Sequence, residues 1–141
     1  MSENNKKTHT VSQEELDRQK QFTQKVSSVI SASYNEKPKA CVVTYGCQQN
    51  VADSEKIKGM LELMGYDFTD NRLEAKLIIF NTCAVREHAE DRVFGNVGAL
   101  KSYKRENHDV VIALCGCMTS MPHHILSSTL LTFLEVYPVC Y

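Results

Sequence analysis

The stretch Leu77-Ile78-Ile79-Phe80-Asn81-Thr82-Cys83 decides the fold of this chain. Its apolar run stops at Asn81-Thr82, and a charged pattern with helical period begins after the cysteine. A short, continuous apolar run bounded by turn residues is typical of a strand that is buried on both faces of a sheet. We therefore predict a strand over 75–80 and a helix over 85–105, with Cys83 just beyond the carboxyl end of the strand.

Two similar units flank this stretch. Strands are predicted over 39–45 and 109–114, and Cys47 and Cys117 follow them closely. A helix is predicted over 53–64, capped by Asp53, because its apolar residues fall on one helical face. Alternation of strands and helices predicts an α/β fold, a small parallel sheet with flanking helices. All strand ends then point the same way, so Cys47, Cys83 and Cys117 share one edge of the sheet.

The composition limits the class of protein. The chain has 141 residues, of which 43% are hydrophobic and 23% charged, enough for one domain with a real core. A net charge of −1 gives no global field that would attract nucleic acid. We find no apolar stretch long enough to span a bilayer and no signal peptide, so we expect a cytoplasmic protein without membrane contact. Its six cysteines are then expected to serve metal binding or catalysis rather than disulfides.

The chain divides into three parts by composition. Residues 1–36 are predicted to be a polar N-terminal extension, partly helical over 13–30 behind a capping box at Ser12. Residues 37–119 hold the strands, helices and cysteines described above. Residues 120–141 form an atypical tail with an apolar helix face over 125–134, which is either a closing helix of the sheet or sequence foreign to the fold.

Three thiolates at one sheet edge suit a soft metal or an iron–sulfur cluster. Three protein ligands leave one coordination position open, which is the arrangement of a reactive metal site. Asn50, Asn81 and Thr82 could supply supporting hydrogen bonds. On spacing alone, three unrelated buried thiols remain the leading alternative.

Other candidate residues have ordinary explanations beside functional ones. We favour packed thiols for Cys41 and Cys115 over a redox role, and Cys140 is incidental. An exposed histidine pair at 123–124 is favoured over a zinc site with Cys117. The basic residues that end the predicted long helix (Lys101, Lys104 and Arg105) are favoured as stabilisers of its C-terminus over contacts to tRNA phosphate. For Arg86 and Glu87, an ion pair and a catalytic role stay open.

The short sequence motifs around the three cysteines resemble those of a known family. Tyr45-Gly46-Cys47-Gln48-Gln49-Asn50, Asn81-Thr82-Cys83-Ala84-Val85-Arg86-Glu87 and Gly116-Cys117-Met118 are similar, in this order, to the three motifs of the methylthiotransferase N-terminal domain. Val85-Arg86-Glu87 and Arg92-Val93-Phe94-Gly95-Asn96 are most similar to the branch that makes 2-methylthio-N(6)-dimethylallyladenosine in tRNA. The resemblance covers about residues 38–119.

The resemblance implies a fold, a cofactor and a substrate. Members of this family are cytosolic radical S-adenosylmethionine enzymes that add a methylthio group to the adenosine beside the anticodon of tRNA. Their N-terminal domain is flavodoxin-like and holds an auxiliary 4Fe–4S cluster through three cysteines, which correspond here to Cys47, Cys83 and Cys117. Residues 37–119 would then be this cluster-binding domain.

The sequence also departs from the family. The triplet C-x₃-C-x₂-C, which holds the second 4Fe–4S cluster that cleaves S-adenosylmethionine, does not occur, and no RNA-binding domain follows. We therefore expect an N-terminal fragment that is incomplete as an enzyme. It would need the missing radical S-adenosylmethionine domain to act on tRNA, and its oligomeric state is not predicted. The alternatives are a flavodoxin-like binding module, although no glycine-rich phosphate loop follows the first strand, and a zinc-binding interaction module, neither of them catalytic.

Overall fold

The sheet is parallel throughout. The structure, a computed structural model, describes residues 12–82, 89–116 and 135–136. Its elements are α1 (Gln13–Ser33), β1 (Lys39–Tyr45), α2 (Gln48–Leu63), β2 (Asp67–Phe68), the 3-10 helix η1 (Arg72–Glu74), β3 (Leu77–Thr82), α3 (Ala89–Glu106), β4 (Val111–Cys115) and β5 (Glu135–Val136). The strands pair in the order β2-β1-β3-β4-β5, each pair parallel. This is the flavodoxin-like order, so the predicted α/β class is confirmed.

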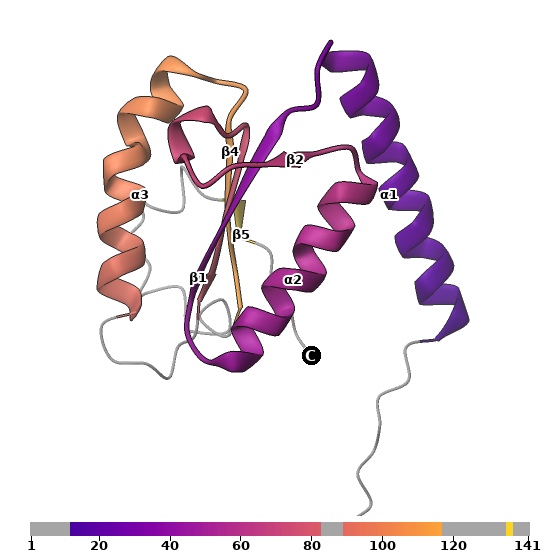
Figure 1. Ribbon diagram of the computed structural model, residues 1–141, viewed down its shortest axis with the longest axis horizontal. Helices are drawn as coiled ribbons and strands as arrows, with labels where there is room; N and C mark the ends of the chain where they lie inside the picture. The colour runs from indigo at the N-terminus through magenta and orange to yellow at the C-terminus, as the bar shows by residue number, and fades with distance from the viewer. Residues whose placement is uncertain (1–11, 83–88, 117–134, 137–141) are drawn as a thin grey trace, which may run out of the picture.

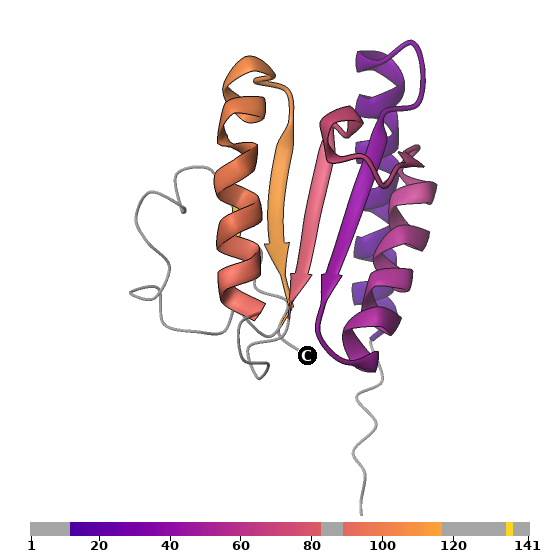
Figure 2. The ribbon, with the colours of Figure 1, turned by 60° about the vertical axis from the view of Figure 1, so that its left-hand side comes forward.

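Helices cover both faces of the sheet. α2 packs on one face and α3 on the opposite face, while α1 lies against α2 on the outside (Figures 1 and 2). The arrowheads of β1, β3 and β4 all point to the same edge, where α2 and α3 begin (Figure 2). Right-handed strand–helix–strand connections produce this arrangement, because each helix must return the chain to the opposite edge before the next parallel strand starts.

The core lies between the sheet and α3. The central strand β3 contributes Ile78 and Phe80, both 0% exposed, and α3 contributes Val97 at 1%. Ile112 and Leu114 of the neighbouring strand β4 complete the same cluster. Residues two apart on a strand point to one face, so these pairs bury a continuous apolar surface.

A single arginine ties the β2–β3 connection to this core. The guanidinium of Arg72 lies over the ring of Phe80, 5.7 Å from its centroid, and donates hydrogen bonds to Tyr45 Oη and Asn96 Oδ1. Tyr45 stacks on Phe80 with ring centroids 6.4 Å apart, and Asn96 Nδ2 donates to Tyr45 Oη at 2.7 Å. This cluster joins η1, β1, β3 and α3. No strand or helix was predicted over 67–74 from the sequence, so β2 and η1 are additions.

Some helices and strands begin or end at residues other than those predicted, and others are as predicted. The strand over 39–45 is confirmed, and so is the N-terminal helix, whose cap Ser12 accepts a hydrogen bond from the Glu15 N–H. The prediction that α2 begins after Asp53 is wrong, because Cys47 caps it and Asp53 lies inside it. The predicted strand over 75–80 is displaced to Leu77–Thr82, since Ala75 still belongs to the end of η1.

Other predictions lie outside the described residues. They concern the start of the helix over 85–105, the apolar face over 125–134, the pair Arg86 and Glu87, the histidines at 123–124 and Cys140. The described part of the third helix is α3, and the third strand is Val111–Cys115 instead of 109–114. None of the helices in the described ranges is long and apolar enough to cross a membrane.

We predict that Ile78→Ala lowers the free energy of unfolding of the 141-residue chain by about 2–5 kcal/mol. Ile78 is 0% exposed in the central strand, so its removal leaves a cavity that the neighbouring side chains cannot fill. Urea denaturation followed by circular dichroism measures the change. Leu73→Ala is the control, because Leu73 is 61% exposed and its loss should change stability by no more than about 0.5 kcal/mol. Equal effects of the two substitutions would contradict the described core.

Candidate functional site

The chain segments that lead to the three predicted ligands meet at the carboxyl edge of the sheet. Tyr45 on β1 pairs in register with Thr82 on β3. Gly116, just after β4, approaches Thr82 so closely that a Cβ atom on Gly116 would overlap the Thr82 carbonyl oxygen. Cys47 is described, whereas Cys83 and Cys117 lie outside the described residues. The structure therefore brings together the points from which the three cysteines follow, two residues after Tyr45 and one residue after Thr82 and Gly116.

Cys47 is the N-cap of α2 and is exposed. Its backbone N–H donates to Asn50 Oδ1 at 3.2 Å, and its Sγ lies 3.3 Å from the same oxygen, to which the thiol donates. The Asn50 side chain closes the first turn of α2, which therefore begins at Gln48 and not at the predicted residue 53. The N-terminus of a helix stabilises negative charge, which suits a sulfur that binds metal as a thiolate.

A buried hydrogen-bond network lies directly beneath Cys47. Asn81 Nδ2 donates to the Asn50 carbonyl oxygen at 2.9 Å and to Ser54 Oγ at 3.0 Å. Asn50 Nδ2 donates in return to Asn81 Oδ1 at 3.2 Å, and Ser54 Oγ is 2.6 Å from Thr44 Oγ1. Asn50, Ser54 and Asn81 are 3%, 2% and 1% exposed, so water does not compete for these bonds. The network joins β1, α2 and β3 at one point.

Thr82 is the fourth buried polar residue at this edge. Its side chain is 0% exposed, and Thr82 Oγ1 has no hydrogen-bond partner among the described residues. A buried polar atom without a partner is rare and costly, by about 1–3 kcal/mol, and is found where a site has another use for it. Thr82 directly precedes Cys83, so this atom lies next to a predicted ligand.

Sequence reasoning anticipated only part of this site. Asn50, Asn81 and Thr82 were expected to support the cysteines, but Ser54 and Thr44 were not. The spacing of Asn50 and Ser54 carried a signal, because residues four apart share one helical face and both are polar. Only the fold shows that this face of α2 turns toward the end of β3.

Cys41 and Cys115 are packed thiols, as expected. They are 4% and 7% exposed. Burial raises the pKa of the Cys41 thiol, and burial together with the nearby Asp53 carboxylate raises the pKa of Cys115 to about 11. Both sulfurs therefore stay protonated and apolar in character at neutral pH.

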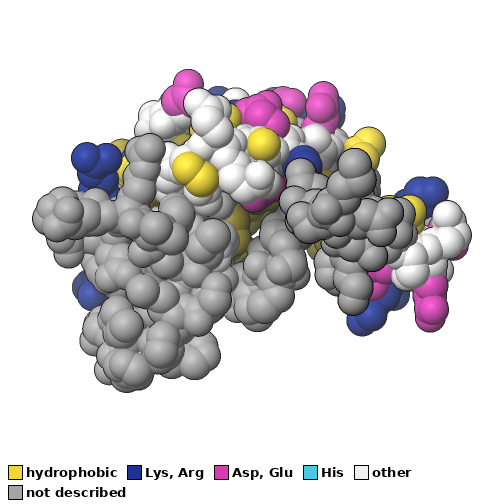
Figure 3. Space-filling model, turned by 90° about the horizontal axis from the view of Figure 1, so that it is seen from below, with side chains coloured by type: hydrophobic (Ala, Val, Ile, Leu, Met, Phe, Trp, Pro, Cys, Tyr) yellow, Lys and Arg dark blue, Asp and Glu magenta, His cyan; other side chains and the backbone are white. Residues whose placement is uncertain are grey.

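Two of the predicted basic residues, Lys104 and Arg105, lie in the last turn of α3, whereas the carboxyl edge of the sheet is where α3 begins. Lys104 Nζ donates to the carbonyl oxygen of Val110, which lies beyond the end of α3, at 2.6 Å, so the expected stabilisation of the helix C-terminus stays a prediction. Acidic and basic side chains both occur on the described surface seen from the carboxyl edge (Figure 3). Within the described ranges, no three metal-ligating side chains lie together, but two of the three predicted ligands fall outside those ranges.

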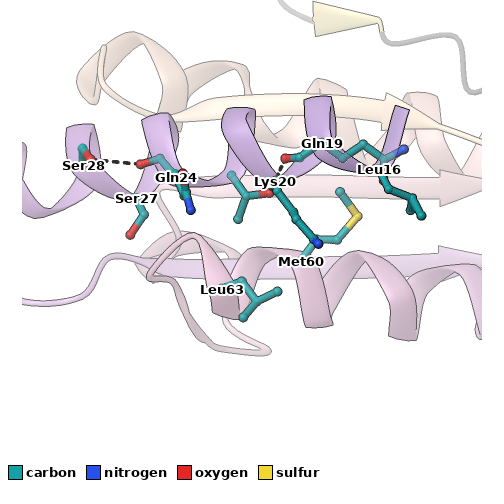
Figure 4. A pocket seen from close by; sticks show the side chains of 9 residues that line it. Leu16, Gln19, Lys20, Gln24, Ser27, Ser28, Met60 and Leu63 are labelled. Atoms are coloured by element: carbon teal, nitrogen blue, oxygen red, sulfur yellow. Dashed lines mark hydrogen bonds between the residues drawn. The ribbon is translucent and has the colours of Figure 1, made fainter. Parts of the chain in front are cut away.

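A groove between α1 and α2 forms a hollow of about 570 Å³ on the described surface. Leu16 and Lys20 line it from α1, and Met60 and Leu63 line it from α2 (Figure 4). It lies at the C-terminal end of α2, whereas Cys47 caps the opposite end of this helix. None of the described residues that line it carries a thiol or a carboxylate, and we assign it no role at the cysteine edge.

We predict that Gly116→Ala lowers the free energy of unfolding by at least about 2 kcal/mol. Gly116 has a φ angle of +97°, and its Cβ would overlap the Thr82 carbonyl oxygen and lie 2.7 Å from Asn81 Oδ1. Gly59→Ala in the middle of α2 is the matched control, because a Cβ there meets nothing within 4 Å. This control should gain about 0.5–1 kcal/mol in helix propensity. If denaturant titrations gave changes in the free energy of unfolding of the same sign for both variants, the described approach of Gly116 to β3 would be contradicted.

We predict that Cys47 reacts with Ellman's reagent in the native protein, while Cys41 and Cys115 react only after unfolding. Cys47 is exposed, and the other two are buried with a raised pKa. Thiol titration at neutral pH, with peptide mass spectrometry to identify the labelled cysteines, measures the order. Native labelling of Cys115 as fast as that of Cys47 would contradict the described burial.

Comparison with known proteins agrees with the motifs. Residues 39–132 match the model of a family described as Uncharacterized protein family UPF0004. The tRNA-2-methylthio-N(6)-dimethylallyladenosine synthase of Clostridium beijerinckii is 61% identical over 84 residues, 60% of this chain and 18% of the relative. Its counterpart in Alkaliphilus oremlandii is 58% identical over the same shares, and that of Caldicellulosiruptor saccharolyticus is 54% identical over 71% of this chain and 22% of the relative.

The chain thus spans only 18–22% of the length of these curated relatives. The predicted resemblance is confirmed, while the predicted limits at 37 and 119 stay predictions beside a family match over 39–132. That match covers β1 to β4, α2, α3 and all three motif cysteines. The chain belongs to the family described as Uncharacterized protein family UPF0004.

Proposed function

We propose that this chain is the N-terminal, cluster-binding part of a tRNA methylthiotransferase, and that Cys47, Cys83 and Cys117 hold an auxiliary 4Fe–4S cluster. The observation that carries the proposal is the meeting of three strand ends, each followed closely by one of these cysteines. Residues 37–119 are the proposed cluster-binding unit. The names of the relatives supply the modification, 2-methylthio-N(6)-dimethylallyladenosine in tRNA.

The chemistry of the described residues fits such a group. Thiolates are the usual ligands of iron–sulfur clusters, and Cys47 offers an exposed sulfur at the N-terminus of α2. The buried, unpartnered Thr82 Oγ1 supports a polar site beside Cys83. Cys47, Cys83 and Cys117 would hold such a cluster by three thiolates, and the cluster would supply the iron–sulfur chemistry for methylthio transfer.

The residues of this chain have defined tasks in the proposed site. Asn50 holds the Cys47 backbone and sulfur at the start of α2. Gly116 lets the chain that leads to Cys117 approach β3, because any side chain there would collide with Thr82. The buried Asn50–Ser54–Asn81 network excludes water from the sheet side of the site. Together they fix the directions from which sulfurs reach a common centre.

The remaining parts of the reaction are assigned elsewhere. We propose that S-adenosylmethionine, the second 4Fe–4S cluster and most tRNA contacts belong to a portion corresponding to the rest of the relatives, which this chain does not match. A net charge of −1 supports this assignment, because phosphate binding requires clustered basic residues. The proposed location is the cytosol, where thiols stay reduced. The chain by itself should not modify tRNA.

We predict that anaerobic reconstitution of the 141-residue chain with iron and sulfide gives a brown protein containing both elements. Cys47→Ala, Cys83→Ala or Cys117→Ala should each reduce bound iron severalfold or abolish it, since two thiolates hold a cubane weakly. Absorption spectra and iron and sulfide analysis measure the result. Cys41→Ala is the control and should retain the cluster, because Cys41 lies in the core.

Three outcomes would overturn the proposal. A colourless protein whose three motif thiols all titrate freely would exclude a cluster. Zinc without iron in elemental analysis would favour a zinc-binding interaction module. Retained flavin fluorescence would favour a flavodoxin-like binding module, for which the strand order β2-β1-β3-β4-β5 is a specific observation.

A further inference from the structure

Thr82 differs from the other buried polar residues at the carboxyl edge. Asn50, Ser54 and Asn81 are hydrogen-bonded to one another. Thr82 is buried more completely than any of them, at 0% exposure, yet its Oγ1 has no hydrogen-bond partner among the described residues. The fold therefore satisfies the polar side chains on one face of the end of β3 and leaves a hydroxyl unsatisfied on the other.

The position of Thr82 on β3 explains why the polar network does not reach it. Neighbouring residues of a strand point to opposite faces, so Asn81 is directed toward α2, and Thr82 shares the α3 face with Phe80. Tyr45 pairs with Thr82 in register, but its hydroxyl is hydrogen-bonded elsewhere. Gly116 lies against the Thr82 backbone and has no side chain that could bind the hydroxyl.

A hydroxyl at this place is unfavourable unless another group binds it. Valine has nearly the same shape as threonine and would extend the apolar face of Phe80 without a polar atom. A buried hydroxyl without a partner loses its hydrogen bonds to water and gains none in return. Such atoms are rare in folded proteins. Thr82 is the last residue of β3, at the edge to which the motif cysteines lead, so a group bound at this edge could supply the missing partner.

We propose that the Thr82 hydroxyl donates a hydrogen bond to a sulfur of the cluster that the carboxyl edge binds. Thiolate and sulfide sulfurs are rich in electrons and accept hydrogen bonds, and a threonine hydroxyl supplies one O–H donor. The inference rests on the proposed function for the identity of the bound group. The chain without the cluster carries a donor that has no acceptor, and the cluster completes the bond.

Two consequences follow for the bound cluster. Hydrogen bonds to the sulfurs are one of the factors that set the reduction potential of an iron–sulfur cluster. Such a bond withdraws electron density from the sulfur and favours the reduced cluster, so it raises the potential. Groups that hydrogen-bond to metal ligands also strengthen metal binding. Loss of the Thr82 hydroxyl should therefore lower the potential and weaken the hold on iron.

The first test uses the 141-residue chain without a cluster and compares two buried hydroxyls. Thr82→Val removes the hydroxyl without a partner, whereas Thr44→Val removes one that lies 2.6 Å from Ser54 Oγ. In urea denaturation we expect the midpoint of Thr82→Val to equal or exceed that of the wild type, and the midpoint of Thr44→Val to fall. A lower midpoint for Thr82→Val, or a failure of this variant to fold, would overturn the proposal, because the hydroxyl would then have a partner in the chain or a buried water.

The second test uses the chain after anaerobic reconstitution with iron and sulfide. We expect the cluster of Thr82→Val to have a lower reduction potential than that of the wild type and to release iron severalfold faster to a chelator. Thr82→Ser keeps the hydroxyl and should retain the potential and the release rate of the wild type. Protein-film voltammetry measures the potential, and the absorbance of the iron–chelator complex measures the release.

The outcomes separate this inference from the proposed function. If the wild type binds a cluster and Thr82→Val matches it in both potential and iron release, the inference fails and the proposed function stands. Equal losses in Thr82→Ser and Thr82→Val would also overturn the inference, because the hydroxyl would not be the cause. If the wild type binds no cluster, the proposed function fails and the inference fails with it.

Discussion

The buried amide of Asn81 is the contact on which the carboxyl edge of this sheet depends. It stands at the end of a strand whose preceding residues are apolar, at a place where another apolar residue would only add to the core. Its three hydrogen bonds reach α2 through Asn50 and Ser54. Each such bond contributes about 1 kcal/mol, but leaving the partners unsatisfied would cost more, so the network tolerates one arrangement only.

This constraint explains how a small sheet can build a site at its edge. Parallel strands in register bring Tyr45 beside Thr82, and the glycine at 116 brings the end of β4 against them. The amide network then fixes the start of α2, and with it Cys47, relative to β3. Strand register sets the place of the proposed site, and buried polar bonds set the position of Cys47, its first proposed ligand.

The opposite face of the sheet supplies rigidity. Phe80 lies beneath Tyr45 and Arg72, and Asn96 links these two side chains to α3. The η1 connection is therefore held to the core on the α3 side, while polar bonds hold α2 on the other side. The proposed site therefore lies on strand ends and a helix start that are held from both faces of the sheet. A site built on such rigid elements moves less than a site built on a free loop.

The sequence by itself determined the α/β class, the first strand, the N-terminal helix, the packed character of Cys41 and Cys115 and the family. These features depend on local patterns, such as an apolar run, a capping residue or a sequence motif. Such patterns can be recognised without knowing which residues lie on the neighbouring strands. The tertiary structure alone decided that α2 begins at Gln48, that Ser54 and Thr44 join the network and that Arg72 reaches Tyr45 and Asn96. These partners are 10 to 27 residues apart along the chain. Strand register brings these partners together, and burial makes it costly to leave a polar group without a hydrogen bond. No local sequence pattern encodes either of these conditions.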